Sequence, residues 1–555
     1  MYTCKNCGGA LKYDIASGQL KCDSCDTQYD PYAVTQEQDA ERDDYDVTVF
    51  KCPQCGGEIY STDNTAAGFC SFCGASTVLS SRLVKEKKVD YLIPFKKTKE
   101  DCKQAYGKLM RRALYAPKEL KDPTNIDGFR GIYMPYWVYH VKQQGHVKLH
   151  GTKSYRRGDY IITKHYGLHM DVDAQYKGLS YDASSAFSDD ISAKMSPYDV
   201  KNMKPFTPSL LSGFYADMSD VEADIYAQDA KAFSADATTN RIRRSPEIAG
   251  YALENAETIP HKIPPHIVST DSAMMPVWFL SYRNRDRVAY AAVNGQTGRV
   301  VADLPVDIRK YLLGCVIFAV PIILLLNLFL TLTPSALLAL VSILATCVIA
   351  LHAHEMKQIA VKENYEDDKG IQSAKEQQEK MARQRATEQM GAGIEEPYVL
   401  TKEQMRRNEK GQKKAAGKKP LLEGTSLGSI IVIVGIVFFG CGFLSAFESL
   451  FQDMPFILYM IILVIAASAF GYSMKQAKRI DAKKHNGDSV WALIAVIVCA
   501  VIGFINPVSD LWYYGGAIGA MVTMCFTLID IIVSYNILAT RRLPQFDHKG
   551  GDDLA

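Results

Sequence analysis

Eight cysteines near the start of the chain form four pairs, and each pair has two residues between its members. The first set of four consists of Cys4, Cys7, Cys22 and Cys25, and the second set consists of Cys52, Cys55, Cys70 and Cys73. Both sets read C-x2-C-x14-C-x2-C, and equivalent cysteines lie 48 residues apart, as Cys4 and Cys52 do. Two residues between thiols allow a tight turn that directs both at one ion. The spacing therefore predicts two zinc ribbons that arose by internal duplication.

Four protein thiolates on each ion leave no coordination position for an activated water. We therefore expect two structural zinc ions that contribute folding free energy, and no catalytic metal. Regularly spaced thiols in a reducing compartment are metal ligands more often than disulfides. The chain opens with Met1-Tyr2-Thr3-Cys4 and continues polar, without the apolar core of a secretory signal, so we expect a cytoplasmic N-terminus.

The ribbon region is acidic. Residues 1–80 hold five basic and twelve acidic side chains, a net charge of −7 before the zinc tetrathiolates are counted. This charge repels a phosphate backbone, which argues against nucleic acid as a partner. The acidic linker between the ribbons is either a solvated spacer or a docking segment for a basic partner.

Six apolar stretches after residue 310 each have about the 20 residues that a membrane-spanning helix needs. They are 311–330, 336–354, 426–447, 455–474, 490–509 and 515–538. They form three close pairs, which predicts three helical hairpins. Lysine and arginine flank the pairs, as at Arg309, Lys310, Arg541 and Arg542, whereas the hairpin tips have neither residue type. The positive-inside rule then predicts a multi-pass plasma-membrane protein with both termini in the cytoplasm.

The membrane region is predicted to be an anchor, because Asp530 is the ionisable residue that we identify well inside a span, and transport pathways usually contain several. The insertion 355–425 ends in a basic segment from Lys402 to Lys419, where only Glu403 and Glu409 are acidic. Anionic lipid headgroups are the expected partner of that segment.

The soluble middle of the chain, residues 81–308, has the pattern of an α+β domain. Strands are expected at Tyr133–Val141, Val277–Arg283, Val288–Val293 and Arg299–Asp303. The similarity of Met134–Tyr139 to Met275–Leu280 indicates two related strand units. A helix from about Ser219 to Asn240 is expected to pack on this sheet through five apolar residues. These are Val221, Ala223, Ile225, Ala230 and Phe233.

Two further patterns in this region have simple interpretations. The segment Val293–Gly298 lacks the lysine and helix of a phosphate loop, so we expect a turn. Five histidines are close in sequence but form no zinc-protease motif, so we expect exposed strand positions and no further metal site. They are His140, His146, His150, His165 and His169.

Together with the ribbons, four short motifs resemble a known family over roughly the first 310 residues. The motifs are Tyr91–Phe95, Gly131–Trp137, Gly213–Asp217 and Val293–Gly298. The chain is similar here to bacterial TFIIB-type zinc-ribbon membrane proteins, which are often automatically named replication-restart helicases. No Gly-x4-Gly-Lys-Ser/Thr loop occurs in this chain, which argues against a helicase.

The resemblance implies partners and a setting. In Gram-positive bacteria, similar proteins are encoded beside a stomatin- or flotillin-like SPFH protein, a TPM-domain membrane protein and phage-shock protein A. It thus implies a membrane platform in the envelope-stress response, although three hairpins and a long basic insertion are more elaborate than the anchors of that family.

The sequence therefore predicts a multidomain protein: two tandem β zinc ribbons, a soluble α+β domain and an all-α membrane region. The expected boundaries are ribbon 1 at 1–32, acidic linker 33–49, ribbon 2 at 50–80, α+β domain 81–308, hairpins 311–354, 426–474 and 490–538, insertion 355–425 and cytoplasmic tail 539–555. The expected function is a non-enzymatic scaffold that docks cytoplasmic proteins at the inner leaflet. The alternatives are a membrane-tethered nucleic-acid binder and a channel or transporter with a ribbon as its regulatory head.

Overall fold

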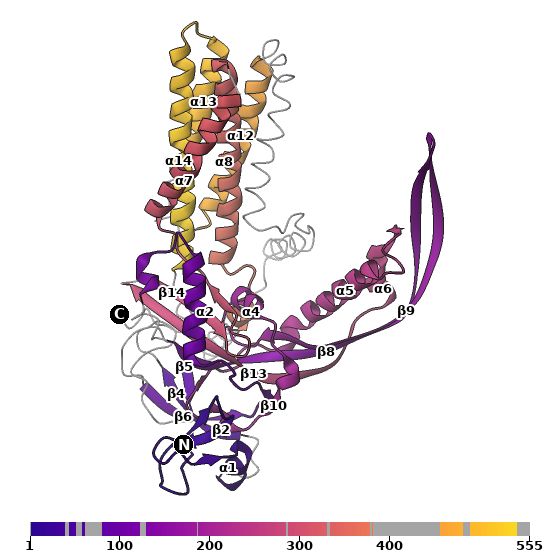
Figure 1. The fold of residues 1–555 in the computed structure, drawn as a ribbon, viewed down its shortest axis with the longest axis vertical. Coiled ribbons are helices and arrows are strands. Elements are labelled where there is room, and N and C mark those ends of the chain that lie inside the picture. The colour runs from indigo at the N-terminus through magenta and orange to yellow at the C-terminus, as the bar shows by residue number, and fades with distance from the viewer. Residues whose placement is uncertain are drawn as a thin grey trace, which may run out of the picture. The chain divides into compact units, whose positions relative to one another are not determined.

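The computed structural model describes residues 2–38, 44–51, 58–61, 80–122, 129–185, 187–284, 287–329, 333–377, 380, 455–480 and 489–540 (Figure 1). The chain divides into two compact units. The first unit contains Met1–Ile317, Val361–Glu376 and Tyr535–Ala555. The second unit contains Phe318–Ala360 and Gln377–Ser534.

The N-terminal ribbon is a small three-stranded antiparallel sheet in the first unit, with β1 (Leu11–Asp14), β2 (Gln19–Cys22) and β3 (Gln28–Tyr29), and it is followed by helix α1 (Pro31–Gln38). The turn between β1 and β2 forms because the Asp14 carboxylate accepts a hydrogen bond from Ser17 N at 2.9 Å and Gly18 adopts a φ of 68°. The chain between the two cysteine pairs thus forms a β-hairpin.

A twelve-stranded sheet forms the body of the first unit, and its centre is the antiparallel pair β8 and β13. Its strands are β4 (Asp44–Lys51), β5 (Glu58–Ser61), β6 (Ser80–Lys87), β7 (Tyr91–Leu92), β8 (Arg130–Arg157), β9 (Tyr160–Asp182), β10 (Lys204–Pro205), β11 (Tyr215–Ala216), β12 (Ala252–Leu253), β13 (His266–Asn284), β14 (Arg287–Asn294) and β15 (Val300–Ala302). The four predicted strands lie within β8, β13 and β14 and across β15, so these predictions are confirmed.

The two similar strand segments begin opposite each other. Met134 of β8 pairs with Met275 of β13, and from this pair the two segments run in opposite directions along their antiparallel strands, so that Trp137 pairs with Ser272 and Trp278 pairs with Gly131. The flanking strands follow the same pattern, because β11 runs parallel to β8 from Ile132 and β7 runs parallel to β13 from Ala273. The predicted relationship between the two strand units thus corresponds to a local two-fold arrangement.

Side-chain hydrogen bonds repeat this two-fold arrangement. The indole Nε1 of Trp137 donates to Val221 O, and that of Trp278 donates to Lys97 O, both at 2.8 Å. The two tryptophans occupy matching positions of the similar segments, and their acceptors follow β11 and β7 respectively. The same tryptophan bond to a backbone carbonyl therefore occurs twice in the first unit, at matching positions.

The four motifs that carry the family resemblance meet in one aromatic cluster. Phe95 stacks on Phe214 with ring centroids 4.3 Å apart, and it contacts Tyr133 and Trp278 edge-on at 4.9 and 5.3 Å. A Cβ atom at Gly295 would lie 2.6 Å from the Phe95 ring, so glycine permits this close packing. The motifs are thus core elements of the sheet.

Four α-helices accompany the sheet in the first unit: α2 (Lys99–Arg112), α4 (Asp189–Met195), α5 (Ala227–Arg244) and α6 (Ile259–Lys262). The predicted helix Ser219–Asn240 is shifted, because residues Ala223–Tyr226 form a 3-10 turn and α5 begins after it. Phe233 is 55% exposed and does not pack on the sheet as expected. The buried face of α5 consists mainly of small side chains such as Ala230 and Ser234, which allow close approach.

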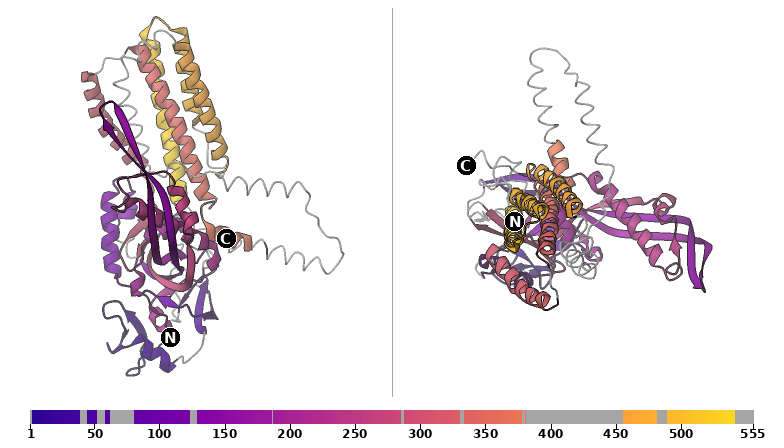
Figure 2. Two further views of the ribbon diagram at one scale, coloured as in Figure 1. Left: turned by 90° about the vertical axis from the view of Figure 1, so that its right-hand side faces the viewer. Right: turned by 90° about the horizontal axis from the view of Figure 1, so that it is seen from above.

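Strands β8 and β9 form a long two-stranded arm, the most extended part of the first unit (Figures 1 and 2). Helices α5 and α6 cover one face of the arm, where Val147 and Leu149 are buried against Ile242, Ile259 and Ile263. Beyond Gly151 the arm continues to the turn at Gly158, and residues 153–161 are all exposed.

The second unit is helical. Among the described residues, three helices are long and apolar enough to cross a membrane: α8 (Pro334–Glu363), the part Leu458–Ala477 of α12 (Pro455–Ala477), and α14 (Asp510–Ala539). They contain the predicted spans 336–354, 455–474 and 515–538. Helix α7 (Ile308–Phe329) covers most of the predicted span 311–330, and the shorter α13 (Ser489–Ile505) covers most of 490–509.

The predicted span 426–447 and the basic segment Lys402–Lys419 lie outside the described residues. Three membrane-spanning helices are therefore supported, and six spans in three hairpins stay a prediction.

Candidate metal centre and buried polar sites

The first set of cysteines forms a compact four-thiol cluster. The sulfur atoms of Cys4, Cys7, Cys22 and Cys25 all lie within 4.8 Å of one another. Cys4 and Cys25 are 3.5 Å apart, and Cys7 lies 3.4 Å from both Cys22 and Cys25. Sulfurs that bind one zinc tetrahedrally at about 2.3 Å are roughly 3.8 Å apart, close to these distances. Four converging thiols with this spacing fit one zinc ion.

The two cysteine pairs have the same backbone turn. Gly8 N donates to Cys4 O at 2.8 Å, and Asp26 N donates to Cys22 O at 3.0 Å. Gly8 and Asp26 each follow the second cysteine of their pair, and both adopt positive φ, at 72° and 57°. Glycine and aspartate are among the residues that tolerate this region. The sequence thus supplies suitable residues at both turns that aim the thiols.

Polar neighbours stabilise the thiolate form of two ligands. The hydroxyl of Tyr29 lies 3.3 Å from Cys4 Sγ and lowers the pKa of that thiol to about 6. The Thr27 hydroxyl, 3.1 Å from Cys25 Sγ, lowers the pKa of Cys25. Thiolates are the form that binds zinc, so these contacts favour metal binding at neutral pH.

The second set, Cys52, Cys55, Cys70 and Cys73, lies outside the described residues. The neighbouring strands β4 and β5 pair antiparallel from Lys51 and Glu58 onward. One cysteine cluster is thus present within the described chain, and the second zinc site stays a prediction.

The first ribbon packs directly on the large sheet. Tyr13 N donates to Ser212 O at 3.0 Å, and the Tyr13 ring contacts Phe214 at 6.5 Å between centroids. Cys4 and Cys22 belong to the same buried cluster as Leu92 and Phe214. A metal ion here would therefore stabilise one side of the first unit's core as well as the ribbon itself.

The five histidines lie on or near the arm. His146 and His169 are cross-strand neighbours with ring nitrogens 3.4 Å apart, and His146 Nδ1 lies 2.8 Å from Asp171. His140 contacts Asp271, and His165 lies near Glu254. In the described residues they do not form a set of three converging ligands, so the cysteine cluster remains the one candidate metal centre there.

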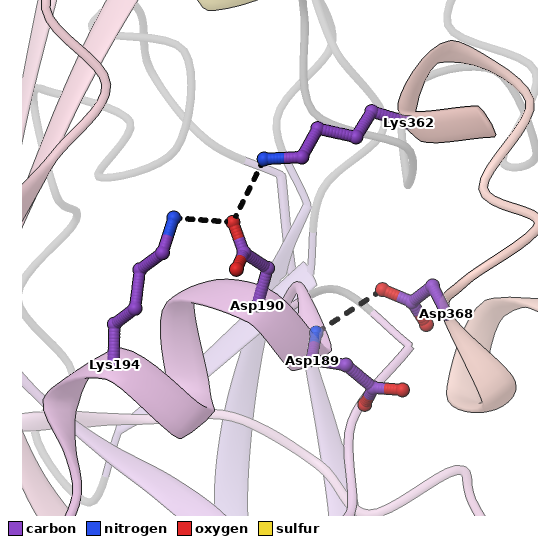
Figure 3. A network of polar contacts seen from close by, with 5 residues as sticks. All are labelled: Asp189, Asp190, Lys194, Lys362 and Asp368. Carbon is purple, nitrogen blue, oxygen red and sulfur yellow. Dashed lines mark hydrogen bonds and ion pairs between the residues drawn. The ribbon is translucent and has the colours of Figure 1, made fainter. Parts of the chain in front are cut away.

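Polar contacts hold the segment after α8 on helix α4 of the first unit (Figure 3). Asp189 N donates to Asp368 Oδ2 at 3.1 Å, and Lys369 N donates to Asp189 Oδ2 at 2.9 Å. The next residue, Asp190, forms ion pairs with Lys194 and Lys362 at 2.6 and 3.3 Å. We call this set of contacts the α4 clasp.

The pKa values of the three carboxyl groups of the α4 clasp are shifted in different directions. Burial and then the charge of Asp189 raise the pKa of Asp368 to about 7. Burial also raises the pKa of Asp189. Burial opposes ionisation of Asp190 too, but its ion pairs with Lys194 and Lys362 outweigh that effect and lower its pKa. The clasp therefore contains one paired carboxylate and two destabilised ones.

A buried polar contact joins three helices of the second unit. His352 of α8 lies with Nε2 2.8 Å from Asp530 Oδ2 of α14 and with Nδ1 2.7 Å from Ser473 Oγ of α12. His352 is 1% exposed, and Asp530 is 8% exposed. Ionisable groups inside a membrane helix are costly and are usually paired. Asp530 thus has a partner that the sequence analysis did not identify.

The sequence alone shows that His352 is a second ionisable residue inside a predicted span, because it lies within 336–354. No pattern connected it to Asp530, which is 178 residues away along the chain. The clasp likewise joins residues 179 positions apart, Asp189 and Asp368. Contacts at such separation leave no periodicity or spacing in a single sequence.

Comparison with known proteins gives one informative similarity. No family model matches the chain, and no solved structure matches it significantly. YdjG, an uncharacterized protein of Bacillus subtilis, is 28% identical over 315 residues, which cover 56% of this chain and 91% of YdjG. The chain is thus similar to nearly the whole of a bacterial protein whose description assigns no activity.

Proposed function

We propose that this chain is a non-enzymatic, membrane-anchored platform whose zinc-ribbon unit docks protein partners at the inner leaflet. The observation that carries the proposal is that the first unit includes the start of α7 up to Ile317, the end of α8 with the segment after it (Val361–Glu376), and the end of α14 from Tyr535. A unit built around helix ends suits the task of holding partners beside a bilayer.

Specific contacts fix these segments within the first unit. The Asn536 side chain accepts from Val306 N at 2.7 Å and donates to Val306 O at 2.8 Å. The α4 clasp holds Asp368 and Lys369, in the segment that follows α8, on Asp189 of α4. These bonds join residues 230 and about 180 positions apart, so they oppose separation of the folded unit from its helix ends.

The partner classes implied by the resemblance are an SPFH protein, a TPM-domain protein and phage-shock protein A, with envelope stress as the setting. The test uses the full chain in lipid nanodiscs and the three candidate partners from the same genome, with binding measured by interferometry. We expect saturable binding of at least one candidate. Binding of none of them, with the zinc content intact, would contradict the proposal.

A ribbon variant and a matched control sharpen the test. The double change Cys4→Ser and Cys7→Ser removes two ligands and should weaken partner binding. The control is Cys102→Ala, which changes a buried cysteine of α2 outside the cluster. This variant should leave partner binding unchanged. Binding of an oligonucleotide and of no protein would instead support the nucleic-acid alternative.

The buried contact of His352 with Asp530 and Ser473 favours a second candidate, a channel or transporter. Transport proteins place paired ionisable side chains between helices in this way. The test is cation and proton flux into proteoliposomes that contain the full chain. Flux that Asp530→Asn abolishes would support this candidate, whereas leakage equal to that of protein-free vesicles would eliminate it.

A further inference from the structure

The tip of the β8–β9 arm carries exposed apolar side chains beside basic ones. Tyr160 is 78% exposed, Ile161 is 75% exposed and Tyr155 is 44% exposed. Residues 153–164, which we call the arm tip, contain four basic residues and one acid, a net charge of +3. The charged residues are Lys153, Arg156, Arg157, Lys164 and Asp159.

The strand register defines the faces of the arm tip. Tyr155 lies opposite Ile162, and Arg157 lies opposite Tyr160, so these four side chains share one face. The same face is buried nearer the base of the arm, at Leu149. The face that α5 and α6 cover at the base thus continues, without those helices, to the exposed end, where Lys153, Lys164 and Arg157 lie among its apolar side chains.

The opposite face also ends in an apolar side chain. Ile161 lies opposite Arg156 on that face, directly beside the turn at Gly158. Lys164 Nζ lies 5.6 Å from the Tyr155 ring centroid, so the basic and aromatic groups are in mutual contact. The end of the arm therefore presents apolar groups on both faces, with Arg156 and Arg157 directly opposite Ile161 and Tyr160 and with Lys153 and Lys164 behind them.

We propose that the arm tip inserts into the surface of a bilayer that contains anionic phospholipids. Tyr160 and Ile161 near the end suit the boundary between headgroups and acyl chains. The long side chains of Arg156 and Arg157 beside them reach back to the phosphate level, where Lys153 and Lys164 also lie. The strand from Lys153 to Arg157 extends roughly 15 Å, enough to cross a headgroup layer. This proposal does not depend on the proposed docking function.

The arrangement favours lipid over nucleic acid, although both offer phosphates. Single-stranded nucleic acid stacks its bases on aromatic side chains along a basic groove. The arm tip is a two-stranded ribbon with apolar side chains on opposite faces, and Ile161 offers no stacking surface. A bilayer surrounds an inserted tip on every side, so it accommodates both faces at once.

The test uses the full chain with a coumarin amino acid in place of Tyr160. The protein is placed in nanodiscs of phosphatidylcholine and titrated with separate vesicles of phosphatidylcholine, with or without 30% phosphatidylglycerol, that carry doxyl-labelled lipid. A second format places phosphatidylglycerol and the doxyl lipid in the nanodisc itself. The two formats together detect insertion into another membrane or into the protein's own.

We expect doxyl lipid to quench the coumarin in at least one format, with a requirement for phosphatidylglycerol. In the vesicle format, Arg156→Gln with Arg157→Gln should raise the half-saturating lipid concentration about 25-fold, since each basic side chain contributes about fivefold. In the nanodisc format the same variant should reduce quenching. Arg243→Gln with Arg244→Gln, on exposed positions of α5, is the matched control and should change neither value.

Coumarin that stays in water in both formats would overturn the proposal. Quenching that is the same with and without phosphatidylglycerol, and the same in the arginine variant, would also overturn it. A coumarin shift caused by an added oligonucleotide, without lipid quenching, would overturn it in favour of nucleic acid. Because the arm tip is exposed, circular dichroism of the variants should match that of the unchanged protein.

Discussion

Replacing Asp368 with asparagine should remove most of the pH dependence of the α4 clasp. The Asp368 carboxylate accepts hydrogen bonds from Asp189 N at 3.1 Å and from Ile371 N at 2.9 Å. Burial and the neighbouring Asp189 raise its pKa to about 7, whereas the unfolded value is about 3.9. The folded clasp therefore binds a proton that the opened segment releases.

The sign and size follow from this difference. Between pH 4 and 7 the folded state holds more protons than the opened state, so stability falls as pH rises. From pH 5 to pH 8 the loss is about 2.5 kcal/mol, or close to a hundredfold in the opening equilibrium. Asparagine stays neutral, so Asp368→Asn should remove this part of the change, and the slope that remains comes from Asp189, whose pKa burial also raises.

Hydrogen exchange of the full chain in nanodiscs measures this directly, with peptides that contain the amides of Asp189 and Ile371. Protection factors should be compared at pH 5 and pH 8 after correction for intrinsic exchange. The exposed neighbour Asp367 gives the control for a lost charge. Its charge is the smallest of the causes that raise the pKa of Asp368, so Asp367→Asn should leave most of the pH slope in place. An unaltered pH slope in Asp368→Asn, or a flat slope in the unchanged protein, would refute the reasoning.

Three further predictions concern the other sites. Zinc analysis of the full chain should give two ions, and Cys7→Ser should lose one of them; a retained pair would rule out the first ribbon as a site. In the second unit, Asp530→Asn should lower the free energy of unfolding in detergent by about 2 to 4 kcal/mol, because it disrupts a buried pair. Adding His352→Gln to this variant should lower it little further. Additive losses in denaturation experiments would show that the two residues do not interact. Trp137→Phe and Trp278→Phe should each cost about 1 kcal/mol from the lost indole bond, and very unequal costs in urea titration would contradict the two-fold arrangement.

The first ribbon, with its four-cysteine cluster, was predictable because its determinants are local. Two-residue spacers and residues that tolerate positive φ, Gly8 and Asp26, specify each turn without reference to the rest of the chain. The β13–β14 hairpin was predictable for the same reason. The packing of the ribbon on Phe214 was not, because it depends on a contact about 200 residues away in sequence.

The long arm and the buried polar contacts could not be read from the sequence. An amphipathic strand pattern predicts strands, but it does not say that β8 and β9 are 28 and 23 residues long and so continue beyond the body of the sheet. The helix prediction erred at Phe233 because apolar character was taken to mean burial, whereas α5 packs through Ala230, Ser234 and Thr238. Small side chains pack closely but contribute little to an apolar pattern.

Photocrosslinking in intact membranes tests the central claim most directly. A photoreactive amino acid is placed at Ala16 of the ribbon or at Leu114 after α2, both exposed positions of the first unit, and captured proteins are identified by mass spectrometry. The account predicts a crosslink from at least one position to an SPFH protein, a TPM-domain protein or phage-shock protein A, stronger under envelope stress. Crosslinks to nucleic acid alone, or to none of these proteins under stress, would contradict it.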